Sequence, residues 1–143
     1  RYLPQDSHLP ERAALAVPVQ HCPPQSCHET PWPGRADEPP LRPLRLLQPP
    51  EPVEVLAEVP DGPPAQFTWR RVTHRVARAE GPERIAMEWW RRPEPGLTRD
   101  YFRIEDEVGA RFWLYRDGLY GREVLPSADG HGQPRWYVHG LFA

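Results

Sequence analysis

Apolar and polar residues alternate most clearly within Arg99–Asp117. Two runs rich in aromatic and β-branched residues, Asp100–Glu105 and Ala110–Arg116, are joined by a polar loop that ends at Gly109. Glycine accepts the positive φ that a tight turn requires, so strand-like runs on either side of such a turn predict a β-hairpin.

The second run of this hairpin is apolar on both faces. Phe112 and Leu114 share one face of the predicted strand, and Trp113 and Tyr115 share the other. A strand with two apolar faces is usually covered on both sides. We therefore expect this strand to be the central one of the core.

Further short strands are expected on both sides of the hairpin. Alternation predicts strands over Val53–Val59, Leu119–Leu125 and Trp136–Phe142. Within Phe67–Ala79 the apolar phase changes at Arg70 and Arg71, which indicates a bulge or a tight turn there. Six to eight short strands predict a mainly-β fold, a small antiparallel sheet or barrel.

Proline separates the two halves of the chain. Sixteen of the 21 prolines lie in residues 1–64, whereas 13 of the 15 aromatic residues lie in residues 65–143. Proline lacks an amide donor and disrupts helices and central strands, so the core belongs to the second half. We predict the end of a preceding domain in 1–20, a proline-rich, largely irregular linker in 21–50 and a β-rich module in 51–143.

Composition and charge exclude some classes of protein. The net charge is −2 and the isoelectric point is about 6.3, so no overall basic field attracts nucleic acid. All 18 basic residues are arginine, which we attribute to coding bias. No apolar run approaches the ~20 residues of a membrane span. We expect a cytoplasmic bacterial protein with no membrane association, and, since the chain starts at Arg1, a piece of a longer one.

Cysteine and histidine gather at His21, Cys22, Cys27 and His28. These residue types bind zinc, but structural zinc sites usually join ligand pairs about 12 or more residues apart. The closely spaced set therefore favours an unstructured linker with incidental thiols, and we predict no metal site and no cofactor.

Catalytic residues are not indicated by any pattern. Glu105, Asp106 and Glu107 lie in a hairpin loop, where carboxylates are usually solvated, and His74 and His139 lie on predicted strands. The chain contains no nucleophile-elbow, phosphate-loop or dinucleotide-binding motif. We predict that this stretch has no enzymatic activity.

Nucleic-acid binding is an alternative that the arginines suggest. A basic run that consists of Arg70, Arg71, Arg75 and Arg78 follows the aromatic residue Trp69. Aromatic platforms interleaved with arginine hold single strands on small β-barrels. The other interpretation, which we favour, places the aromatic residues in the core and the arginines on the solvated face of the same strands.

Six segments resemble the C-terminal region of the ImuB family, the Y-family-polymerase-like proteins of bacterial mutagenesis cassettes. They are H-L-P-E-R-A at 8–13, R-P-L-R-L-L at 42–47, G-P-E-R-I at 81–85, R-D-Y-F at 99–102, R-F-W-L-Y-R-D at 111–117 and W-Y-V-H-G-L-F-A at 136–143. The segments occur in the family's order across most of the chain.

The resemblance implies a non-catalytic adaptor in DNA-damage-induced translesion synthesis. It implies that residues 1–20 end a polymerase-like, little-finger-like domain. The implied partners are the RecA-like protein ImuA and an error-prone C-family DNA polymerase. The family's sliding-clamp peptide is expected outside this chain. The resemblance also implies a cytoplasmic protein that associates with the nucleoid during the damage response.

Partner binding is expected at the hairpin and the last strand. The candidates are Arg99, Tyr101, Arg103, Trp113, Tyr115, Trp136, Tyr137, His139, Leu141 and Phe142. The alternative is a single-stranded-DNA-binding barrel that uses the basic run after Trp69.

Overall fold

A computed structural model describes residues 2–21, 42–43, 45–58, 62–88, 90, 96–119 and 134–142. The chain divides into two compact units, Arg1–Leu41 and Arg42–Ala143. The predicted linker lies mostly outside the described residues, and the three predicted domain boundaries remain predictions.

The first unit contains a small two-stranded ladder. Strand β1 (Tyr2–Pro4) pairs antiparallel with β2 (Ala14–Ala16), in the register Leu3 to Leu15. Two single turns of 3-10 helix, η1 (Pro10–Arg12) and η2 (Val19–His21), complete its described part. Proline at the start of η1 is compatible with a helical first turn, where its missing amide is not needed.

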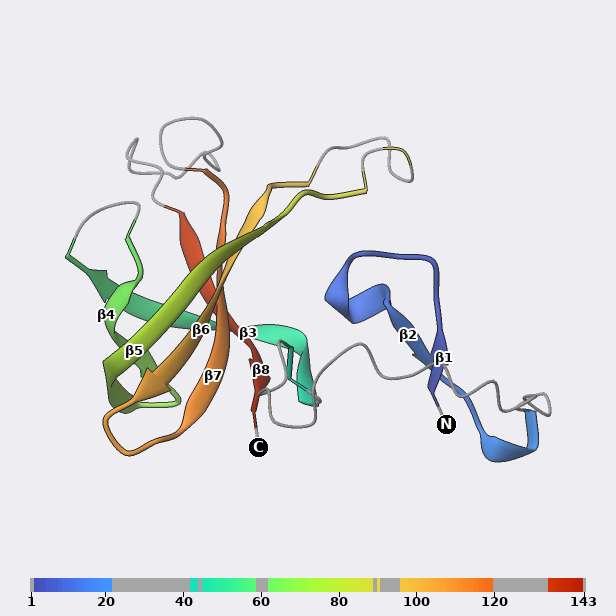
Figure 1. Ribbon diagram of the computed structural model, residues 1–143, viewed down its shortest axis with the longest axis horizontal. Helices are drawn as coiled ribbons and strands as arrows, with labels where there is room; N and C mark the ends of the chain where they lie inside the picture. The colour runs from blue at the N-terminus through green and yellow to red at the C-terminus, as the bar shows by residue number, and fades with distance from the viewer. Residues whose placement is uncertain are drawn as a thin grey trace. The chain divides into compact units, whose positions relative to one another are not determined.

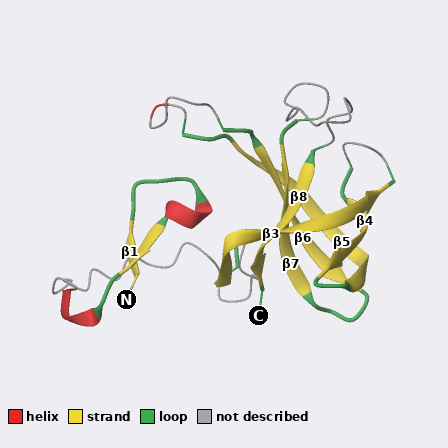
Figure 2. Ribbon diagram, turned by 180° about the vertical axis from the view of Figure 1, so that it is seen from behind, coloured by secondary structure: helices red, strands yellow, loops and turns green. Residues whose placement is uncertain are grey.

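The second unit is a closed antiparallel barrel (Figure 1). Each strand pairs with its neighbour in the sequence, and the last strand pairs with the first. The strands are β3 (Arg45–Ala57), β4 (Pro64–Trp69), β5 (Val72–Ile85), β6 (Arg99–Asp106), β7 (Arg111–Asp117) and β8 (Arg135–Leu141). Figure 2 shows the same strands from behind. The predicted mainly-β, barrel-like fold is confirmed.

The predicted hairpin is β6 and β7. In its ladder, Arg99 pairs with Asp117 at one end and Glu105 pairs with Arg111 at the other. Gly109, in the connecting turn, has a φ of 85°. Strand β7 also pairs with β8, so it lies inside the sheet with five consecutive buried residues. The expectation of a central strand covered on both faces is confirmed.

One face of the strands fills the barrel. The buried core consists of Phe67, Phe102, Ile104, Phe112, Leu114 and Val138. These residues come from β4, β6, β7 and β8 and meet at the barrel axis. The rings of Phe67 and Phe112 pack edge to face at 5.2 Å, an arrangement that aromatic pairs prefer.

Prolines shape β3 without ending it. The strand pairs with β8 at Arg45 and Leu46, shifts register, and resumes at Glu51. Pro49 and Pro50 lie in the shifted segment, where a residue without an N–H does not weaken a regular ladder. As far as Ala57, the predicted strand at Val53–Val59 is the end of this longer strand, and Val59 lies outside the described residues.

The phase change at Arg70 and Arg71 is a tight turn between β4 and β5. Both residues have positive φ, 50° and 68°. The predicted strand at Leu119–Leu125 lies outside the described residues apart from Leu119.

None of the helices among the described residues has the length and apolar character that crossing a bilayer requires.

Candidate interaction surfaces

The outer face of β6, β7 and β8 carries a second layer of aromatic side chains. Tyr101 and Trp113 stack with ring centroids 4.2 Å apart, and the Tyr101 hydroxyl is 2.8 Å from Nδ1 of His139. Tyr115 stacks on Tyr137 at 5.1 Å. Four of these five residues are at most 4% exposed, Tyr137 being half-buried. This aromatic layer therefore acts as core, although it lies outside the barrel.

The first residues of the second unit contribute to the cover of this layer. The Arg42 guanidinium lies 5.8 Å from the Trp113 ring centre. Pro43 packs so closely on Gly140 that a side-chain carbon at that position would overlap its ring. Arg99 covers Tyr115 at 4.7 Å, and burial raises the pKa of the Tyr115 phenol well above its ordinary value.

The ten predicted partner-binding residues differ in their exposure and in the contacts they make. Tyr101, Trp113 and His139 are at most 1% exposed, and their contacts are inside the protein. Arg103 forms an ion pair with Glu80 at 3.0 Å.

At the end of β8, Leu141 packs on the barrel core and Phe142 lies beneath Arg111, whose guanidinium is 6.0 Å from the ring centre. Trp136 and Tyr137 are half-buried and line a groove. Binding of a partner at these ten residues stays a prediction.

A charged cluster around a buried carboxylate lies at one end of the barrel. Asp100 is fully buried and accepts hydrogen bonds from Arg84, at 2.7 and 2.9 Å, and from Arg116 at 2.8 Å. Burial alone would raise the pKa of Asp100, but the two arginines outweigh that effect and hold it below its usual range. Arg116 is itself only 2% exposed and lies 5.9 Å from the Trp136 ring centre.

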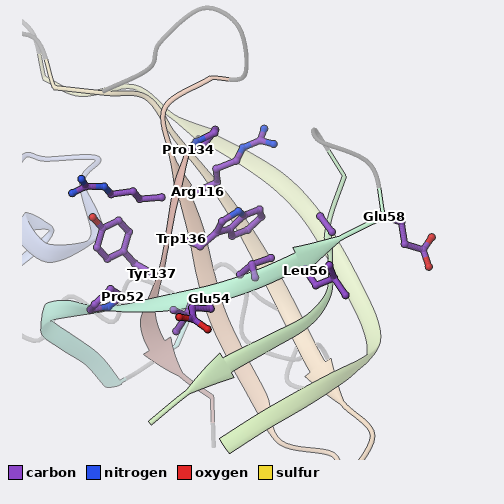
Figure 3. A pocket seen from close by; sticks show the side chains of 12 residues that line it. Pro52, Glu54, Leu56, Glu58, Arg116, Pro134, Trp136 and Tyr137 are labelled. Carbon is purple, nitrogen blue, oxygen red and sulfur yellow. The ribbon is translucent and has the colours of Figure 1, made fainter. Parts of the chain in front are cut away.

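The groove opens beside this cluster, where β3 diverges from β8 (Figure 3). Its volume is about 1030 Å³. One wall is β3 from Pro52 to Glu58, and the other consists of Arg116 together with Pro134–Tyr137. Trp136 packs on Phe102 at 5.3 Å, so its ring is held in place by the core.

Only the β8 side of this groove was predicted from the sequence. Trp136 and Tyr137 were predicted as binding residues, but the β3 wall and Arg116 were not. The sequence contains one indication of the β3 wall. Leu56 lies between Glu54 and Glu58 on the otherwise polar face of the strand. Leu56 is 64% exposed.

The basic run after Trp69 is largely engaged within the protein. The Trp69 indole donates to Glu51 at 2.8 Å, and Arg70 binds the same carboxylate while lying 4.5 Å from the Trp69 ring centre. Arg78 pairs with Glu80 at 2.5 Å. Arg71 and Arg75 are exposed and make no ion pair with the residues that the structure describes. Arg70 therefore occupies one face of the Trp69 ring, and base stacking would need such a face.

His74 and Asp106 form a further pair beside the core. Their Nδ1 and Oδ2 atoms are 2.8 Å apart, and the His74 ring stacks on Phe67. Asp106 also accepts the amides of Val108 and Ala110, which fixes the β6–β7 turn. Burial opposes its charge, but the hydrogen bonds from His74 and the two amides dominate and lower the pKa of Asp106.

Three of the four candidate zinc ligands, Cys22, Cys27 and His28, lie outside the described residues. The fourth, His21, is an exposed residue of η2. Among the residues with described positions, no three metal-ligating side chains come together.

Comparisons with known proteins give one kind of match. No protein-family model and no solved structure matches the chain. The chain is 46% identical, over 97% of its length, to protein ImuB of Caulobacter vibrioides strain NA1000 / CB15N, and equally to that of strain ATCC 19089 / CIP 103742 / CB 15. It spans 28% of the length of these relatives.

The fold and its surfaces define a small β-barrel module with an aromatic outer layer and a groove at one end. The identity to ImuB confirms the resemblance seen in the sequence. This chain corresponds to a C-terminal segment of ImuB.

Proposed function

We propose that this chain is a non-catalytic adaptor module that recruits protein partners during DNA-damage-induced translesion synthesis. The observation that carries the proposal is the 46% identity to ImuB over 97% of the chain. That relationship supports a role in the ImuA–ImuB mutagenesis system. The expected partners are the RecA-like ImuA and the error-prone C-family DNA polymerase, in the cytoplasm and at the damaged nucleoid.

The geometry supports binding to protein more than catalysis. The buried carboxylates of Asp100 and Asp106 serve the fold. Asp100 binds two arginines, and Asp106 binds His74 and the amides of a turn. The open groove, by contrast, offers Leu56 and the half-buried Trp136. Exposed apolar residues beside a polar rim are typical of recognition surfaces.

Binding of single-stranded DNA is the second candidate. The exposed guanidinium groups of Arg71 and Arg75 favour it. It is weakened by the engagement of Trp69 and Arg70 with Glu51, because a stacking platform needs a free aromatic face. A steep dependence of affinity on salt would be its signature.

Co-purification tests the adaptor proposal. The full chain, tagged and co-expressed with ImuA or with the polymerase, is expected to retain at least one of them. Deletion of residues 136–143 is unsuitable as a negative control, because β8 closes the barrel against β3 and β7. The same chain, unfolded by heat before mixing, serves as the negative control.

The same preparation distinguishes the second candidate. Labelled single strands are titrated with the chain at two salt concentrations. Retention of neither protein, together with micromolar and strongly salt-dependent binding of the strand, would replace the adaptor proposal by DNA binding.

A further inference from the structure

We propose that the groove between β3 and β8 binds an extended peptide segment of a partner protein by strand addition. The segment carries basic residues opposite Glu54 and Glu58 and apolar residues between them. This inference builds on the proposed adaptor function, because it specifies how one partner is held.

The groove contains a strand edge that the described part of the barrel leaves unpaired. The ladder between β3 and β8 ends at Val53 and Trp136. Strand β3 continues for four more residues, Glu54–Ala57, which pair with β4 on their other side. The backbone groups of a strand edge offer hydrogen bonds to an added strand about 4.8 Å away.

The floor of the groove suits apolar side chains. Val53 and Val55 pack against the barrel core on the inward face of β3, and Trp136 closes the floor from β8. Because successive side chains of a strand point to opposite faces, every second side chain of an added strand would lie on this floor. The volume of about 1030 Å³ is sufficient for a short strand, being at the upper end of ligand pockets.

The rim of the β3 wall is acidic. Glu54, Leu56 and Glu58 share the outward face, and all three are exposed. Neither carboxylate forms an ion pair with any residue whose position is described. Across the groove, the charge of Arg116 is already matched by Asp100, and Arg135 is an exposed cation on the same wall. On the β3 side, charge complementarity selects a strand with a cation opposite each glutamate and an apolar residue opposite Leu56.

The edge admits one short strand. Pro52 precedes it without an amide donor, and Glu54 and Glu58 lie at its two ends. Prolines and charges on an edge restrict the open-ended pairing that leads to aggregation. A short segment with basic and apolar residues can still be added to this edge, because neither the proline nor the two glutamates block it.

A designed peptide provides a probe that does not depend on either expected partner. We would use fluorescein-labelled SGKVLVKGS, whose two lysines and central leucine match the acidic rim and Leu56. Its anisotropy should rise to saturation when the intact chain is added. Hydrogen exchange should slow at the amides of β3 between Glu54 and Ala57. The peptide SGEVLVEGS should bind much more weakly.

Variants of the rim separate binding from folding. The double change Glu54→Lys and Glu58→Lys should raise the Kd for SGKVLVKGS about tenfold, because two exposed ion pairs are replaced by repulsion. Leu56→Ser should also weaken binding. Glu107→Lys and Val108→Ser are matched controls on exposed residues that do not line the groove, and they should leave the Kd unchanged.

The outcomes separate the two proposals. No saturable binding of SGKVLVKGS, or a Kd unaffected by the rim variants, overturns the groove as a peptide site even if ImuA or the polymerase co-purifies. Peptide binding without co-purification of either protein retains the groove and contradicts the adaptor role. Binding of a labelled dT15 strand that Arg135→Glu abolishes, with no peptide binding, would assign the groove to nucleic acid.

Discussion

At the residue scale, the buried carboxylate of Asp100 links β5, β6 and β7 inside the barrel. It pairs with Arg84, whose side chain is 57% exposed, and with Arg116, whose side chain is only 3% exposed. Removing one partner of a buried ion pair is costly because the other charge stays buried. Nothing in the sequence around Asp100 distinguishes it from the exposed carboxylates of other strands, so this cluster emerged only from the fold.

We expect Asp100→Asn to destabilise the protein by about 3–5 kcal/mol, measured by urea denaturation. The control is Glu83→Gln, which removes an exposed ion pair with Arg42 and should cost at most about 1 kcal/mol. Equal effects of the two variants would show that the Asp100 cluster does not stabilise the barrel.

Acid should unfold the protein partly through Asp106 and Asp100. Both have a pKa below the ordinary value in the folded state. Their stabilisation is therefore complete above the unfolded pKa, about 3.9, and is lost as pH falls through the lower folded pKa. Stability between pH 5 and pH 2 should fall less steeply in Asp106→Asn than in the parent. Identical slopes would contradict this role.

At the element scale, β8 depends on a close approach to the segment that precedes β3. A β-carbon at Gly140 would overlap Pro43 and lie 3.1 Å from the Arg45 carbonyl oxygen. Glycine at this position allows Pro43 to cover the outer layer. Such a requirement is invisible in the sequence, because it joins two segments about 100 residues apart.

Gly140→Ala should destabilise the protein by about 1–3 kcal/mol, as overpacking usually does. Pro43→Ala removes the ring atom that the new methyl would meet, so the double variant should recover part of the loss. A thermal or urea double-mutant cycle measures this coupling. Additive effects would mean that the two residues do not meet.

Local sequence patterns succeeded where a strand or turn is set by its own residues. The β6–β7 hairpin and the two-faced β7 were predicted, and the turn at Arg70 and Arg71 is one of the two alternatives, bulge or tight turn, that the pattern indicates. The full length of β3 was not, because its prolines indicate an interruption and the barrel tolerates them at a register shift. The β3 wall of the groove depends on barrel closure, a long-range property that alternation does not encode.

At the scale of the whole molecule, the barrel unit has two apolar layers that share β7. The inner layer fills the barrel, and the aromatic layer covers its outer face beside β8. Both layers depend on aromatic residues from the second half of the chain. This arrangement explains why so few of the predicted partner-binding residues are exposed.

Trp113→Ala should cost about 3–5 kcal/mol, a large part of the stability of a typical domain. Its ring is 1% exposed and contacts both Tyr101 and Arg42. The expected result is a large fall in the melting temperature that accompanies any loss of binding. A variant that loses a partner while melting normally would instead identify Trp113 as an interface residue.

The adaptor role is tested most directly by an equilibrium titration of the intact chain with purified ImuA and with purified C-family polymerase. At physiological salt, we expect saturable binding to at least one of them, weakened by Leu56→Ser and by the double change of Glu54 and Glu58 to lysine. Absence of binding to both proteins by a folded chain would contradict it.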